Sequence, residues 1–143
     1  MFHERRLSVL KAILVASIAS TGLHYTHNYV NVADYPQSSA VSNGETRLGI
    51  VILWPLLTAI GLVGYRLYAQ GRLRPAHLCL ALYSATGIST LGHFLVGNPQ
   101  IPTFFYATLF TDGLLGFAVL GFTFWSLAQT RPAPAAAARG AMQ

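Results

Sequence analysis

Four long apolar runs constrain this 143-residue chain more than any other feature of its sequence. A helix crosses the hydrocarbon core of a bilayer, about 30 Å thick, in roughly 20 apolar residues. The runs cover approximately residues 7–28, 48–67, 76–96 and 101–127, so each is long enough to span. We therefore expect an all-α integral membrane protein, folded as an antiparallel bundle of four transmembrane helices.

The composition excludes several other classes of protein. Charged residues make up 9% of the chain, against about 25% in soluble domains. The net charge of +5 comes from residues beside the apolar runs and forms no basic stripe, so we expect no nucleic-acid partner. The sequence carries no phosphate-binding glycine loop and no hydrolase nucleophile motif. Cys79 is the single cysteine, which excludes an intrachain disulfide.

The segments between the runs divide the chain into one membrane domain and a tail. Residues 31–47 are rich in Ser, Asn, Gly and Pro and predict an outer loop, whereas residues 71–75 and 97–100 predict short turns. Residues 1–129 form the predicted four-helix domain. Residues 130–143, rich in Pro and Ala, form a predicted cytoplasmic tail without an apolar pattern.

Basic residues predict the orientation in the membrane, because they concentrate on the cytoplasmic side. They flank the start of the first run, the turn between the second and third, and the end of the fourth: Arg5, Arg6, Lys11, Arg66, Arg72, Arg74, Arg131 and Arg139. Arg47 alone falls on the opposite side. We therefore expect both termini in the cytoplasm. Arginine outnumbers lysine eight to one, and with the Ala-rich tail this indicates a bacterial inner membrane.

A cleaved signal peptide is the alternative interpretation of the first run. Residues 1–20 have a basic start, a short apolar core and small residues at Ser17 and Ala19. Cleavage there would leave three spans. We favour an uncleaved first helix because the apolar character continues to Leu23.

Each predicted helix has one face that is smaller or more polar than the rest. Such faces turn inward, because lipid tails offer no hydrogen bonds. Glycines at positions 61, 64, 113 and 116 lie on these faces and predict close approach of neighbouring backbones.

Ionisable residues within the runs are few, and such residues often carry function in membranes. His24, His27, His93 and Asp112 all belong to the outer half, whereas His77 is expected at the cytoplasmic interface. His24 and His27 lie one turn apart on one helix. Imidazole and carboxylate groups together suit zinc, copper or iron. The four residues therefore predict a metal site, in which Asp112 is either a ligand or a carboxylate that orients a histidine.

Helix lengths place Asp112 roughly 7–10 Å below His24 along the bundle, and helix tilt would close some of that distance. Further candidate ligands are Asn28, Asp34 and Tyr25. A metal-free, hydrogen-bonded network of the same histidines and Asp112 is the alternative.

Three interpretations of function remain open. The first is a metal-binding protein that handles copper, zinc or iron, or uses it in redox chemistry. The second is a binder of a lipid-like small molecule, or an isomerase-type enzyme that uses His and Asp for proton transfer. The third is an accessory subunit of a larger membrane complex, or a homo-oligomer.

One short stretch supports the second interpretation. The sequence His24-Tyr25-Thr26-His27-Asn28, followed by Asp34-Tyr35-Pro36, resembles the end of the first helix in the EXPERA family. That family contains four-helix sterol isomerases and sigma-receptor-like proteins, so the resemblance implies a pocket for a lipid-like ligand. The acidic residue that those proteins carry in their second helix is missing, since residues 48–67 contain no Asp or Glu.

Overall fold

The computed structural model describes residues 2–36 and 38–130, which are helical apart from short connections. No strand occurs in these residues, so the prediction of an all-α fold is confirmed for them. Four helical segments, at 4–30, 43–69, 73–96 and 103–130, are long and apolar enough to cross a membrane. The elements are α1 (Phe2–Val30), η1 (Val32–Asp34), α2 (Asn43–Ala69), α3 (Leu73–Ile88), η2 (Ser89–Gly92), α4 (His93–Val96) and α5 (Thr103–Thr130).

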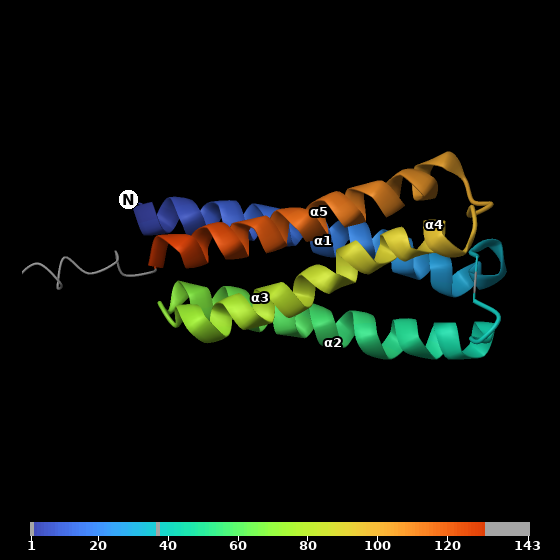
Figure 1. The fold of residues 1–143 in the computed structure, drawn as a ribbon, viewed down its shortest axis with the longest axis horizontal. Helices are drawn as coiled ribbons and strands as arrows, with labels where there is room; N and C mark the ends of the chain where they lie inside the picture. Colours follow the sequence, from blue (N-terminus) through green and yellow to red (C-terminus); the bar gives the residue numbers. More distant parts are fainter. Residues whose placement is uncertain (1, 37, 131–143) are drawn as a thin grey trace, which may run out of the picture.

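The long helices form an elongated bundle in which successive helices run in opposite directions (Figure 1). Each packs against two neighbours around the bundle, in the order α1, α2, α3, α5 and back to α1. The start of α1 and the end of α5 lie at one end, which we call the terminus end. Residues 31–42 and 97–102 lie at the other, which we call the loop end (Figure 1).

The second helix begins earlier than the apolar pattern predicts. Ser42 accepts a hydrogen bond from the backbone of Glu45, and the Glu45 side chain accepts one from the backbone of Ser42. This reciprocal capping box satisfies two amides that would otherwise lack partners at the start of a helix. The first turns of α2 therefore occupy part of the segment predicted as loop, and the connection at the loop end shortens to residues 31–42.

The third membrane-length segment is bent rather than straight. Its α-helical geometry ends at Ile88, a 3-10 turn follows, and one α-helical turn, α4, starts at His93. The Thr90 hydroxyl donates to the carbonyl of Gly87 at 2.6 Å and also contacts the carbonyl of Leu109 in α5. Hydroxyl groups that bond back to helix carbonyls favour bending. The bend sets the position of His93 at the loop end.

Glycines allow the helices to approach closely, as predicted. A Cβ atom added at Gly116 of α5 would lie 2.8 Å from the backbone nitrogen of Ile88 in α3. One added at Gly61 of α2 would lie 2.7 Å from the Tyr83 ring. Real Cβ atoms do not come this near. Gly87 of α3 lies in the same α3–α5 contact as Gly116, and a Cβ added at Gly87 would overlap the carbonyl oxygen of Asp112.

The two halves of the bundle differ in their interiors. The half toward the terminus end is filled mainly by large apolar and aromatic side chains, Leu10, Leu14, Tyr68, Ala76, Leu80, Tyr83, Val119 and Phe122. The half toward the loop end buries His24, Asn28, Thr86, Thr90, Thr108 and Asp112. The buried acidic residue Asp112 and its partner His24 therefore lie toward the loop end, whereas His77 and Ser126 are buried toward the terminus end. The predicted tail lies outside the described residues, apart from Thr130.

Candidate functional site

A fully buried histidine–aspartate pair lies at the centre of the polar half. The Nδ1 atom of His24 in α1 and the Oδ2 atom of Asp112 in α5 are 2.8 Å apart, and both side chains have zero exposure. The expected offset of Asp112 below His24 therefore does not keep the two side chains apart. His24 lies nearly two turns inside the end of α1, and Asp112 lies more than two turns inside α5.

Hydroxyl groups hold the second carboxylate oxygen of Asp112. The Ser20 hydroxyl, one turn before His24 on α1, donates to Oδ1 of Asp112. Ser20 also lies 2.8 Å from the hydroxyl of Thr111. The carboxyl group thus has a partner on each oxygen, as a buried acidic group in an apolar medium requires. Together these contacts fix the orientation of the His24 ring.

His93 and Asn28 extend the cluster toward the loop end. The Nδ2 atom of Asn28, one turn after His24, lies 3.3 Å from Nε2 of His93. The rings of His24 and His93 have centroids 5.6 Å apart and meet edge to face. His93 reaches this position because α4 follows the bend in the third segment. The structure therefore brings together three of the four predicted site residues: His24, His93 and Asp112.

Tyr35, from the connection after α1, covers the cluster from the loop end. Its side chain is 2% exposed, and its ring centroid lies 5.2 Å from that of His93 and 5.6 Å from that of His24. Burial raises the pKa of the Tyr35 phenol above its ordinary value, and the carboxyl groups of Asp112 and Asp34 raise it further. Tyr35 therefore keeps its proton and presents a neutral hydroxyl group.

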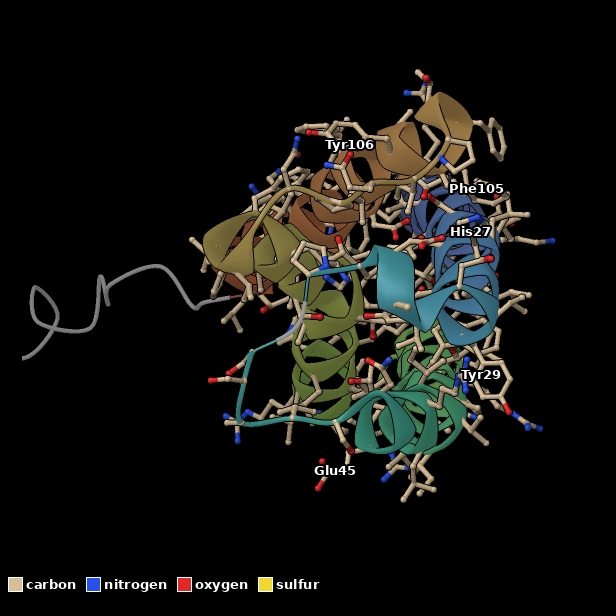
Figure 2. The ribbon with its side chains drawn as sticks, turned by 90° about the vertical axis from the view of Figure 1, so that its right-hand side faces the viewer. His27, Tyr29, Glu45, Phe105 and Tyr106 are labelled. Carbon is tan, nitrogen blue, oxygen red and sulfur yellow. The ribbon has the colours of Figure 1, made fainter. Side chains whose placement is uncertain are left out.

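His27 stands at the edge of this cluster. Its ring stacks on Phe105 of α5 with centroids 3.7 Å apart, and its Nδ1 atom lies 2.9 Å from the Tyr35 hydroxyl. Figure 2 looks onto the loop end and shows His27 and Phe105 side by side. Tyr35 thus links His27 to the other predicted residues, and His27 is half-buried.

Three buried polar atoms near this cluster have no hydrogen-bond partner within residues 2–36 and 38–130. They are Nε2 of His24, Oδ1 of Asn28 and Oγ1 of Thr86, which we call the open atoms. Leaving such an atom unpaired costs about 1–3 kcal/mol. In the neutral His24 ring that donates its Nδ1 proton to Asp112, the Nε2 atom is an acceptor. With the amide oxygen of Asn28, this form of the site offers two acceptors, suited to a group that donates hydrogen bonds.

The same geometry bears on metal binding. Across the described part of the chain, no three His, Cys, Asp or Glu side chains form a group that could hold an ion. The side chains available to an ion near His24 are the imidazole of His93 and the amide oxygen of Asn28. Asp112 occupies Nδ1 of His24, and histidine ligands in metalloproteins are commonly oriented by a carboxylate in this way.

A pocket of about 240 Å³ opens beside the cluster, between α1, α2 and α3. Its lining includes Tyr25, Gly49, Ile50, Leu53, Trp54 and Thr86. The Tyr25 hydroxyl donates to the Thr86 carbonyl at 2.9 Å, and the Tyr25 ring stacks against His24. The pocket therefore combines apolar walls with a polar base, and Tyr25 lies between that base and the histidine–aspartate pair.

A second buried histidine lies near the terminus end. His77 is 6% exposed, and its Nε2 atom lies 3.1 Å from the hydroxyl of Ser126, which also contacts Tyr68. The residue expected at the membrane interface is thus packed inside the bundle, because α5 presents Ser126 toward it.

Helical spacing in the sequence places Ser20 on the same polar face as His24, and Thr86 on the same polar face as His93. It gave neither residue a role at the site, and it did not identify Tyr35 as a neighbour. Tyr35 lies in a connection whose path no helical periodicity describes. Comparisons with protein-family models, with curated proteins and with solved structures find no match for this chain.

Proposed function

We propose that this chain is an integral membrane protein that binds a small lipid-like molecule in the pocket between α1, α2 and α3. The molecule has an apolar body and one polar group that can form a hydrogen bond with the hydroxyl of Thr86. We place the pocket in the outer half of the membrane, because the basic residues that flank the helices concentrate at the terminus end.

The open hydroxyl of Thr86 carries this proposal. Thr86 lines the pocket and is 2% exposed, yet its Oγ1 atom is one of the open atoms. A buried polar atom without a hydrogen-bond partner is costly. A bound molecule with a polar group at this end of the pocket would satisfy Thr86.

The walls of the pocket support an apolar ligand. Ile50, Leu53, Leu57 and Trp54 of α2 line one side. Binding sites for small molecules are commonly concave and mostly apolar, with a few polar groups that fix the orientation of the ligand. The pocket opens at the membrane-facing surface of the bundle, so a ligand dissolved in the bilayer can enter from the side.

The histidine–aspartate pair gives the pocket a possible chemistry. Asp112 holds Nδ1 of His24, and Nε2 is buried without a hydrogen-bond partner in the described residues. A base with one nitrogen fixed by a carboxylate is a common element of acid–base catalysis. An isomerase-type activity would require a proton path from the pocket through the Tyr25 and Thr86 contacts. Binding itself requires no such path.

Blocking the pocket tests the proposal directly. Gly49 lines the pocket, and an added Cβ there meets no described atom within 4 Å, so we choose Gly49→Phe to fill the pocket. Gly121→Phe is the matched control, because Gly121 of α5 is exposed and equally uncrowded. We expect mass spectrometry of organic extracts to find a small molecule retained by the purified wild type and the control but not by Gly49→Phe. An identical extract from all three proteins would refute the proposal.

Binding of copper, zinc or iron at His24 is the second candidate function. Two histidines bound to one tetrahedral ion through nitrogen, at 2.0–2.1 Å, have ring centroids about 5 Å apart. The 5.6 Å between the His24 and His93 centroids is compatible with that arrangement. Asn28 would supply an oxygen, and Asp112 would orient His24 without binding the ion.

Elemental analysis separates the two candidates. Under metal binding, protein purified without chelator carries a near-stoichiometric metal, and His24→Ala and His93→Ala each remove it. His77→Ala, a buried histidine at the opposite end, should leave the metal content unchanged. Gly49→Phe should not alter metal content, because it fills a pocket that His24 does not line.

A further inference from the structure

A second pocket, at the terminus end, combines two arginines with an apolar wall. It has a volume of about 510 Å³ and lies between the start of α1 and the end of α5. Its lining is Arg5, Arg6, Val9, Phe122, Trp125 and Gln129. Figure 1 shows these two helix ends side by side. We propose that this pocket binds the headgroup and upper acyl chain of one anionic phospholipid.

Charge is the first reason for this assignment. Arg5 and Arg6 bring two guanidinium groups to the pocket, and a guanidinium binds a phosphate oxygen pair with two parallel hydrogen bonds. Of the four acidic residues in the chain, Glu4 alone lies at this end. The local charge is therefore positive, and a phosphodiester with a neutral or anionic headgroup complements it.

The arrangement of Arg6 is the second reason. Its Cζ atom lies 4.9 Å from the centroid of the Trp125 ring, in the geometry of a cation–π contact. The contact holds the guanidinium above an aromatic surface rather than in free solution. Arg6 is half-buried as a result, while Trp125 remains 47% exposed and available to a ligand.

The third reason is the apolar wall below the arginines. Val9 is 52% exposed and lies one turn deeper on α1 than Arg5, beside Phe122 and Trp125 of α5. A phospholipid has the same order of chemistry along its length, with phosphate above and hydrocarbon below. A soluble phosphate would leave this wall uncovered, so the pocket favours a lipid over a free anion.

The topology predicted from the basic residues places this end at the cytoplasmic leaflet, where anionic lipids attract basic residues near helix ends. The lipid pocket shares no lining residue with the ligand pocket at the loop end, so the two can be tested independently. Each pocket contains one of the two tryptophans in the chain, Trp54 in the first and Trp125 in the second. Their fluorescence can therefore report on each pocket separately.

The experiment uses the full chain with Trp54→Phe, so that Trp125 is the single reporter. Brominated lipids quench tryptophan on contact, and detergent micelles remove any effect of membrane sidedness. Two arginines near the headgroup contribute roughly 1 kcal/mol each. We therefore expect brominated phosphatidylglycerol to quench Trp125 at a roughly 30-fold lower mole fraction than brominated phosphatidylcholine.

Two double variants of equal charge test the residues. Arg5→Gln with Arg6→Gln should abolish the preference for phosphatidylglycerol. Arg72→Gln with Arg74→Gln, two exposed positions at the same end, should keep it. If the first variant fails to fold, the single exposed substitution Arg5→Gln should still weaken the preference. Equal quenching by both lipids in the reporter protein would overturn the proposal. So would an equal loss of the preference for phosphatidylglycerol in the two double variants.

Discussion

Nδ1 of His24 and Oδ2 of Asp112 lie 2.8 Å apart in an interior that excludes solvent from both side chains. Removing one member of a buried pair leaves an unpaired polar group, at a cost of about 3–5 kcal/mol. Removing both leaves a cavity but no unpaired member of the pair. The two residues should therefore depend strongly on each other for their contribution to stability.

The first prediction is a double-mutant cycle on this pair. We expect His24→Ala and Asp112→Ala each to destabilise the protein. The loss in free energy of unfolding of the double variant should be smaller than the sum of the two single losses, by roughly 1–3 kcal/mol. SDS titration of the detergent-solubilised protein measures the free energy of unfolding. His77→Ala combined with Asp112→Ala is the control and should be additive, because His77 lies near the other end of the bundle.

The second prediction concerns stability at high pH. The folded state raises the pKa of Tyr35, chiefly through burial. In the unfolded chain Tyr35 ionises near pH 10, whereas the folded protein still binds the proton there. The unfolded state then binds fewer protons, so stability falls as pH rises above about 10. Below that pH the contribution is fully present.

Tyr35→Phe removes this dependence and tests it. We expect the variant to show a smaller loss of stability between about pH 9.5 and 11.5 than the wild type. At neutral pH it should be less stable by about 1 kcal/mol, because the hydrogen bond to His27 is lost. Tyr106→Phe, which removes a hydroxyl group bonded to Asn98, serves as control. An unchanged alkaline slope in Tyr35→Phe would contradict the assignment.

The third prediction concerns Thr86, which carries the proposed function. Thr86→Val keeps the shape of the side chain and removes one of the open atoms. We expect unchanged or higher stability without ligand, and weaker retention of the extracted small molecule. Thr90→Val is the matched control, since that hydroxyl bonds the carbonyls of Gly87 and Leu109. The control should lose about 1 kcal/mol of stability and keep the ligand.

The fourth prediction concerns the contact between α3 and α5 that supports the site. Gly87→Ala places a Cβ against the carbonyl oxygen of Asp112, and backbone atoms cannot yield as side chains do. We expect a loss of roughly 1–3 kcal/mol from overpacking. Gly121→Ala should be neutral or slightly stabilising, because its Cβ is unhindered and alanine favours helix by about 1 kcal/mol. Thermal unfolding followed by circular dichroism compares the two.

The four helices follow directly from the sequence because their cause is local. An apolar run of sufficient length in a chain with few charges has one stable conformation in lipid, and the runs here are separated by evident turns. The close approach of helices at Gly61 and Gly116 could equally be predicted, since small residues at helical spacing indicate contact faces. The capping box of Ser42 and Glu45 can also be recognised in the sequence, and it would have predicted the earlier start of α2.

The details of the site were less accessible because they depend on relations between helices. Counting residues from predicted helix ends gave an offset between Asp112 and His24 and did not predict that their side chains meet. Spacing of three along α1 suggested that His24 and His27 act together. A step of three residues turns a helix by about 300°, and that offset carries His27 toward Phe105 while His24 faces Asp112. The bend at Thr90, which places His93, depends on a carbonyl of α5.

The last prediction concerns the membrane itself, on which both proposed ligands depend. With both termini in the cytoplasm, the connection 31–42 faces the outside and the turn near Gln70 faces the cytoplasm. In a Cys79→Ser background, Ser39→Cys and Gln70→Cys place single thiols at exposed positions of opposite ends. A membrane-impermeant maleimide added to intact cells should label Ser39→Cys alone, and lysis should expose Gln70→Cys to it. Labelling of Gln70→Cys in intact cells would reverse the orientation and move the arginine pocket to the outer leaflet. Labelling of both positions before lysis would contradict a four-span arrangement. In that arrangement α2 crosses the bilayer, so the two connections that flank it lie on opposite sides.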